Sequence, residues 1–166
     1  MTIVSNTSPL CYLTLIGHAE ILSALYGRAH ITQKVLEELR HPDAPPPLRN
    51  WATTPPDWLQ IHSDPEDSDD TLAALDPGER TALRLSVQLR SDVVLLDEAA
   101  ARALALQRGL KVSGTLGVLC EAAQAGLLKL PAALDLLRKN QFSRFPAVME
   151  VTLHAVMPPV GRRPGI

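Results

Sequence analysis

Four polar side chains have the types and positions that a metal site would need. Asn6, Glu79 and Asp97 lie at predicted strand ends or helix starts, and Glu38 lies inside a predicted helix. Carboxylates that converge on one cleft repel one another unless cations neutralise them. Mg²⁺ and Mn²⁺ prefer oxygen ligands, and such ions can activate water and stabilise the charge of phosphodiester cleavage. These residue types suit metal-dependent hydrolysis, although their spacing alone does not establish that they converge.

Each of these residues also has a purely structural explanation. Asn6 and Asp97 each precede a predicted helix, where either side chain could serve as an N-cap. Glu79 follows Asp76 by three residues, with Pro77 at the first helical position, which is the pattern of a capping box. From these positions alone, the functional and structural readings both stay open.

Helical geometry separates some of the glutamates. Glu79 shares a stripe with residues spaced three, four and seven positions further on, so it should point toward the core side of its helix: Ala82, Leu83 and Ser86. In the helix predicted after residue 32, Glu37 lies nearly opposite the apolar face, whereas Glu38 lies closer to its border. Glu37 is therefore expected to be solvated, and Glu38 could reach a cleft.

The elements that must position these residues alternate between strand and helix. Short β-type runs are predicted at residues 2–5, 28–31, 93–96 and 111–113. Helices are predicted at residues 10–16, 18–26, 33–40, 76–90, 98–108, 115–125 and 131–140, with a last short one at 148–154. The proline-rich and then acidic stretch 41–70 reads as a surface excursion, with room for a short helix and a short strand near 58–62.

This alternation predicts an α/β fold of three layers, α/β/α, with a central parallel sheet. Functional groups gather at the carboxyl ends of the strands in such sheets. We expect one domain over residues 1–157 and a tail over 158–166 that carries three prolines and two glycines.

Composition narrows the function classes. The 166 residues carry a formal charge of −2, which argues against a protein that coats nucleic acid by bulk positive charge but leaves a metal-dependent nuclease open. Cys11 and Cys120 lack metal-ligand spacing and read as free thiols. No signal peptide and no apolar stretch long enough to cross a membrane is visible, so a cytoplasmic protein without membrane contact is expected.

Several segments, taken in order, resemble one known family. The opening Val-Ser-Asn-Thr-Ser-Pro-Leu of residues 4–10 resembles the start of PIN domains, closest to the DUF3368 PIN-like group. Similar agreement is found at residues 31–39, which end in Glu-Leu, and at the Gly-Glu helix start within 75–82. It continues at 93–97 with Arg102 downstream, at the Gly-Thr segment 112–119 and at 125–128.

The resemblance implies a Mg²⁺- or Mn²⁺-dependent endoribonuclease, such as the toxin of a toxin–antitoxin pair. By motif, the ligands and catalytic residues would be Asn6, Glu38, Glu79 and Asp97. Supporting residues would be Thr7, Ser8, Arg102 and Thr115, although Arg102 could instead only pair with Glu98 and Thr115 could only cap its helix. The implied partners are an RNA substrate, a small antitoxin and a second copy of the chain.

One departure from the family pattern supports a second reading. Active PIN domains normally carry Asp where this chain has Asn6, and an amide offers an oxygen without a negative charge. The alternative is therefore a catalytically weak or inactive PIN-like binding module. A third reading, an unrelated phosphoryl-transfer receiver or hydrolase, lacks a phosphate loop, a GxSxG motif or an Asp-x-Asp after the first strand.

Other conspicuous residues are given structural roles. The five histidines show no metal-ligand spacing and are interpreted as surface or satisfied core residues: His18, His30, His41, His62 and His154. Trp51 and Trp58 are expected to cover the core. For the homodimer, apolar helices near the end of the chain would offer a second surface through Leu127, Leu130 and Leu134, although these leucines could equally fill the monomer core.

Overall fold

A five-stranded, wholly parallel sheet forms the centre of the molecule. The computed structural model describes residues 1–66, 68 and 70–140, so the helix expected at 148–154 and the tail at 158–166 lie outside the described residues. The strand order is β3-β2-β1-β4-β5. The strands are β1 (Ile3–Ser5), β2 (Ala29–Thr32), β3 (Leu59–His62), β4 (Val93–Leu95) and β5 (Val112–Ser113).

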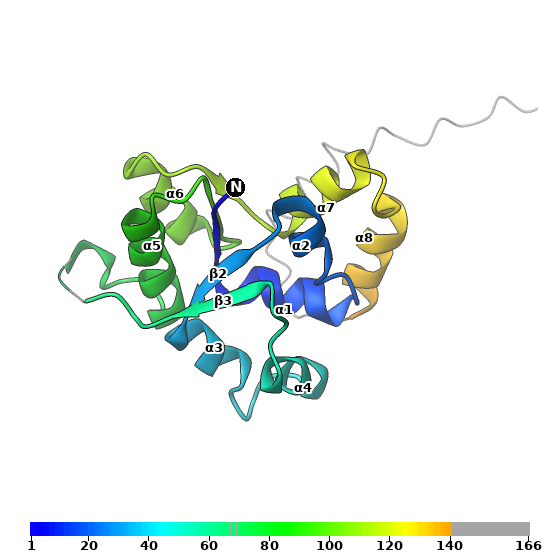
Figure 1. The fold of residues 1–166 in the computed structure, drawn as a ribbon, viewed down its shortest axis with the longest axis horizontal. Helices are drawn as coiled ribbons and strands as arrows, with labels where there is room; N and C mark the ends of the chain where they lie inside the picture. The colour runs from blue at the N-terminus through cyan, green and yellow to red at the C-terminus, as the bar shows by residue number, and fades with distance from the viewer. Residues whose placement is uncertain (67, 69, 141–166) are drawn as a thin grey trace, which may run out of the picture.

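Helices cover both faces of this sheet, as Figure 1 shows. The face that carries α5 (Pro77–Leu89) and α6 (Ala99–Gln107) lies opposite the face that carries α1 (Thr7–Leu15), α2 (Ile21–Tyr26) and α7 (Thr115–Gln124). The remaining elements are α3 (Gln33–Leu39), α4 (Pro46–Thr53), the 3₁₀ turn η1 (Asp70–Leu72) and α8 (Leu130–Lys139). The expected three-layer α/β/α architecture is confirmed.

Two hydrophobic clusters correspond to the two faces. Alternate residues of a strand point to opposite faces. In β1, Ile3 packs into the cluster under α1, α2 and α7, and Val4 packs into the cluster under α5 and α6. In β4, Val94 joins the second cluster and Leu95 the first. Because both faces of the sheet are covered, the central strands β1 and β4 are short, mostly apolar runs, whereas β2 and β3 alternate apolar and polar residues.

The predicted elements are present with shifted ends. Helix α1 begins at Thr7 rather than at residue 10, because Thr7, Ser8 and Pro9 already form its first turn. Helix α2 begins at Ile21 rather than at residue 18, since residues 19 and 20 form a turn. Within the excursion 41–70, the short helix and the short strand are both found, as α4 and β3. The turn η1 was not predicted.

The leucines expected at a second surface divide between core and exterior. Leu134 is only 3% exposed and belongs to the main core, so its expected place on a free surface is wrong. Leu130 packs partly against the same cluster, and Leu127 remains 46% exposed. Among the described residues, no helix is long and apolar enough to span a membrane.

Candidate metal centre

Asn6 directly follows the central strand β1, and its buried side-chain oxygen lacks a hydrogen-bond partner among the described residues. Its backbone N–H donates to the carbonyl of Leu95 at 3.1 Å, which extends the pairing of β1 with β4. Asn6 occupies the N-cap position of α1, but its side chain makes no capping bond. The residue is 4% exposed, and Oδ1 has no hydrogen-bond partner within the described part of the chain. A buried acceptor left in this state costs about 1–3 kcal/mol, so the N-cap explanation does not account for it.

Glu38 links the starts of two helices. Its Oε2 accepts a hydrogen bond from the Thr7 hydroxyl at the start of α1, and its Oε1 accepts from the Gly78 N–H at 2.9 Å. A helix N-terminus is electropositive, so the start of α5 attracts the negative charge of this carboxylate. A Cβ at position 78 would overlap the Glu38 carboxylate, which explains the glycine. Glu37 is exposed and pairs with Lys34, so the predicted contrast between the two glutamates is confirmed.

Glu79 is buried at the first turn of α5 and still fulfils its capping role. It is 5% exposed, and its Oε2 accepts a hydrogen bond from the Asp76 N–H at 3.1 Å, as the capping box requires. Burial raises its pKa, and the carboxylates of Asp76, Glu98 and Glu38 raise it further, against the hydrogen bond from Asp76. The structural explanation therefore holds for one oxygen, while the like charges around Glu79 make it a group that a cation would stabilise.

Asp97 is held in a fixed orientation by the start of α7. Its Oδ1 accepts from the Thr115 N–H at 2.8 Å, and its Oδ2 accepts from the Thr115 hydroxyl at 2.7 Å. Burial raises the pKa of Asp97 and Glu98 adds to this, whereas the bonds from Thr115 and the charge of Arg102 lower it. The N-cap of α6 is Glu98, not Asp97. Asp97 is therefore positioned by a different helix from the one it precedes.

Gly114 packs so close to Asp97 that no side chain fits at position 114. Arg102 donates from Nη1 to the Leu96 carbonyl at 2.7 Å, which places its charge beside Asp97. A Cβ at Gly114 would lie 2.7 Å from Asp97 Oδ1 and 2.9 Å from the Leu96 oxygen. Gly114 is needed for this close approach rather than for a tight turn, since its φ of −152° is open to any residue.

Neighbours of Asn6 connect it to both carboxylate groups. The next residue in the chain, Thr7, binds Glu38, and Leu95, which accepts the hydrogen bond from the Asn6 N–H, lies two residues before Asp97. The charge of Glu98 raises the pKa of both Glu79 and Asp97. Glu98 therefore acts electrostatically on both carboxylate groups. From the sequence, Glu98 is considered as a partner for Arg102. Its position directly after Asp97 is the signal that it could also act on that carboxylate.

Two neighbours complete the description of this region. Ser8 lies in the first turn of α1, next to Thr7, and is half-buried. Cys11 lies one turn beyond Thr7, and burial raises its pKa to about 11, with Asp97 close enough to add to the shift. Both Cys11 and Cys120 are free thiols. The high pKa keeps the Cys11 thiol protonated near neutral pH, which argues against a nucleophilic thiolate.

The residues fit an oxygen-liganded divalent ion. Asn6 Oδ1 is a buried acceptor without a partner, and the carboxylates of Glu79 and Asp97 have raised pKa values that a cation would offset. Across residues 1–66, 68 and 70–140, no three Asp, Glu, His or Cys side chains are grouped closely enough to hold one ion together. Mg²⁺ is usually held by one or two carboxylates plus water, so a full protein cage is not required.

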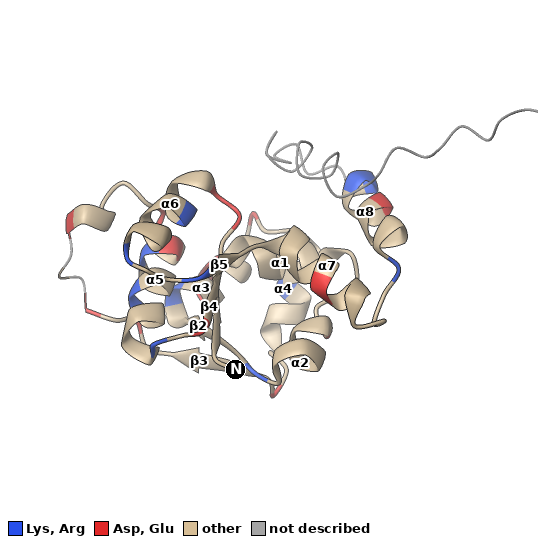
Figure 2. Cartoon of the chain, turned by 90° about the horizontal axis from the view of Figure 1, so that it is seen from above, with Lys and Arg blue, Asp and Glu red and all other residues tan. Residues whose placement is uncertain are grey.

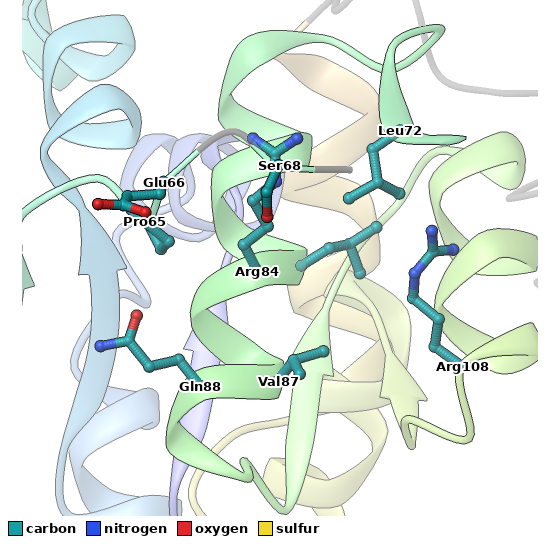
Figure 3. Close-up of a pocket in the computed structure, with 9 residues that line it drawn as sticks. Pro65, Glu66, Ser68, Leu72, Arg84, Val87, Gln88 and Arg108 are labelled. Atoms are coloured by element: carbon teal, nitrogen blue, oxygen red, sulfur yellow. The ribbon is translucent and has the colours of Figure 1, made fainter. Parts of the chain in front are cut away.

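Charged residues are unevenly distributed over the helices, and the pocket along α5 is not lined by the predicted site residues. Figure 2 shows acidic and basic residues interspersed around α5 and α6, whereas α1 and α2 carry no charge. A pocket of about 560 Å³ lies along α5, where Arg84, Val87 and Gln88 contribute to its lining beside Arg108 (Figure 3). None of the predicted site residues lines this pocket. The carboxylates therefore do not share the hollow along α5.

Comparison with known proteins agrees with this architecture. No curated protein matches the chain. The model of the family DUF3368, described as a PIN domain, matches residues 2–157. This match covers nearly the whole chain and agrees with the resemblance carried by residues 4–10 and the later segments. The chain belongs to the DUF3368 family of PIN domains.

Proposed function

We propose that this protein is a PIN-type endoribonuclease that depends on Mg²⁺ or Mn²⁺. The observation that carries the proposal is the buried Asn6 Oδ1, which lacks a partner among the described residues. Its neighbour Thr7 binds Glu38, and its backbone N–H binds Leu95, two residues before Asp97. Family membership supports nuclease-like chemistry on RNA. A neutralising cation would explain why the fold keeps two buried carboxylates, Glu79 and Asp97, whose pKa values are raised.

Glu79 and Asp97 would hold the ion, Asn6 would complete its ligands with an uncharged oxygen, and Glu38 would orient the attacking water. When bound, the ion supplies a water of lowered pKa and offsets charge that develops on the phosphate. Thr115 fixes the orientation of Asp97, and Thr7 and the Gly78 N–H fix that of Glu38. Arg102 contributes a positive charge near Asp97. No side-chain nucleophile is required, which agrees with the high pKa of Cys11.

Metal binding and RNA cleavage by the purified full chain test this proposal. Asp97→Asn should lower cleavage on the order of a thousandfold and weaken Mn²⁺ binding, since a ligand charge is lost. EDTA should abolish cleavage by the wild type. Glu37→Gln is the matched control, because Glu37 is exposed and adjacent to Glu38, and it should cleave like the wild type. Cleavage that persists in EDTA would contradict the proposal.

The second candidate is a catalytically weak or inactive PIN-like binding module. Asn6 favours it, since the position contributes no negative charge to the ion. If the wild type binds RNA without cleaving it and activity appears only in Asn6→Asp, the binding module is the correct function. If the wild type cleaves RNA in Mn²⁺ and loses this activity in Asp97→Asn, the enzyme is.

The proposed biological setting is a toxin with a small antitoxin partner, acting in the cytoplasm. A neighbouring open reading frame for a small protein that binds this chain and blocks its activity would support this setting. We also propose a homodimer, because Leu127 and Leu136, near and on α8, are 46% and 38% exposed. Light scattering at micromolar concentration should then give twice the 18.0 kDa of the chain. A monomer would contradict the homodimer without affecting the proposed chemistry.

A further inference from the structure

Two histidines that are far apart in the sequence meet on one face of the sheet. In the parallel pair β2·β3, His30 lies opposite Gln60 and Thr32 lies opposite His62, so His30 and His62 are on the same face, offset by two residues. His30 Nδ1 lies 2.9 Å from His62 Nε2, and the two rings are 5.1 Å apart between centroids with a 40° tilt. Both side chains are half-buried, and β3 is an edge strand.

We propose that His30 and His62 form a binding site for a divalent transition metal, separate from the carboxylate centre. Neutral imidazole nitrogen suits Ni²⁺, Cu²⁺ and Zn²⁺, whereas Mg²⁺ and Mn²⁺ prefer oxygen. The two sites would therefore differ in the chemical class of ion that they select, although they lie in the same domain.

The separation of the two nitrogens matches such a site. Two ligand nitrogens about 2.0–2.1 Å from one ion lie about 2.9 Å apart when they subtend a right angle, and about 3.4 Å apart at a tetrahedral angle. The observed 2.9 Å corresponds to neighbouring positions around Ni²⁺ or Cu²⁺. Rotation of the two rings would direct one nitrogen lone pair from each toward the same ion. The two bonds to the ion would then replace the hydrogen bond between the rings.

The environment of His30 favours the neutral imidazole that a metal ion needs. Metal ligation requires neutral imidazole. Burial lowers the pKa of His30, and the charges of His62 and Arg28 lower it further. Within the described residues, no third Asp, Glu, His or Cys joins the two histidines in a metal-sized group, so water would fill the remaining positions. The affinity should therefore be modest, and it should fall on acidification as protons compete for the imidazoles.

A bound ion would join the edge strand to its neighbour. Because the pair exists only when β3 is docked beside β2, an ion that binds it stabilises the native state by mass action. The experiment is calorimetric titration of NiCl₂ into the untagged full chain near neutral pH, with excess Mg²⁺ to occupy the carboxylate centre. The wild type should bind one Ni²⁺ and gain thermal stability. His30→Gln and His62→Gln should each weaken binding by about tenfold or more.

Two variants control for other ligands. His41 is an exposed histidine beside Asp43, the competing surface pair, and Asp97 belongs to the carboxylate centre. His41→Ala and Asp97→Asn should bind Ni²⁺ like the wild type. Unchanged binding in the double variant His30→Gln/His62→Gln, or loss of binding in either control, would overturn the proposal.

A readout on the unmodified protein covers the case in which a histidine variant fails to fold. Paramagnetic resonance of the wild type with one equivalent of Cu²⁺ should show coupling to two imidazole nitrogens. Coupling to one nitrogen or to none would overturn the proposal.

Discussion

The Thr7 hydroxyl donates a hydrogen bond to Glu38 Oε2, although 31 residues separate the two in the chain. The contact joins the first turn of α1 to the end of α3, and the other oxygen of the same carboxylate binds the start of α5. One carboxylate therefore fixes three helices around the end of the central strand. A residue proposed for catalysis is in this way also a structural link.

Loss of this bond should weaken both stability and metal binding. Thr7→Val leaves Glu38 with the Gly78 N–H alone, and a hydrogen bond to a charged group contributes about 1.5–3 kcal/mol. We expect a lower midpoint in urea unfolding and weaker Mn²⁺ binding. Thr14→Val in the same helix is the control, because Thr14 Oγ1 is buried without a partner among the described residues, and its replacement should not destabilise the protein. Equal losses in both variants would mean that the exchange of a hydroxyl for a methyl group in α1, not the loss of the bond to Glu38, is responsible.

Asn6→Asp should make stability depend on the ion. Without metal, the substitution adds a charge at a position that is 4% exposed and close to other carboxylates, so the thermal midpoint in EDTA should fall below that of the wild type. With saturating Mn²⁺ the order should reverse, because the new charge becomes a ligand. Mn²⁺ binding measured by calorimetry should tighten, and equal or weaker binding would mean that position 6 does not contact the ion.

Gly114→Ala should disturb Asp97 through packing alone. The added Cβ would lie 2.7 Å from Asp97 Oδ1, so the backbone or the carboxylate must move, at a cost of about 1–3 kcal/mol. Cleavage should fall with stability. Gly117→Ala is the matched control three residues later in α7, where the added Cβ meets only the Ser113 side chain, which can rotate away. It should be neutral or gain up to about 1 kcal/mol from helix propensity.

The ion-free protein should become less stable as pH rises from the acid range. Burial, and then neighbouring carboxylates, raise the pKa of Glu79 above its usual 4.5. A group whose pKa is higher in the folded state binds its proton more tightly there. Its contribution to stability is complete below 4.5 and is lost as pH rises through the folded-state pKa. Asp97 acts in the same direction.

Glu79→Gln isolates the contribution of that residue. Glutamine keeps the capping acceptor but cannot ionise, so the thermal midpoint in EDTA should decline less with pH than that of the wild type. At neutral pH the variant should be the more stable protein and the weaker Mn²⁺ binder. Glu37→Gln should follow the wild-type pH profile, and a similar effect in that variant would point to net charge rather than to Glu79.

The sequence predicted local structure better than contacts between distant elements. Short β-branched runs such as residues 93–96, bounded by polar or glycine residues, have few alternatives to a buried parallel strand. Residues 93–95 accordingly form β4. Helix periodicity also placed Glu38 toward a cleft and Glu37 in solvent. These features depend on residues within a few positions of each other, which is the range that periodicity covers.

Features that depend on strand order were missed. His30 and His62 meet because β3 lies beside β2 in a particular register, and nothing in their spacing along the chain indicates this. The expected exposure of Leu134 is wrong for a related reason, because the burial of this residue depends on how α8 docks against the core. The candidate site was predictable only in part. The strand ends could be predicted from the sequence, whereas the hydrogen bonds from Thr115 to Asp97 and from Gly78 to Glu38 could be found only once the fold was known.

The central position of β1 has a consequence for synthesis. Strand β1 pairs with β4, where Ile3 lies beside Val93, so every residue between these two strands must be made before this pairing can form. Asp97 then depends on Thr115, which emerges later still. A nascent chain that has not yet exposed α7 holds Asn6 and Glu38 but no oriented Asp97. The proposed centre is therefore completed only after α7 has been made.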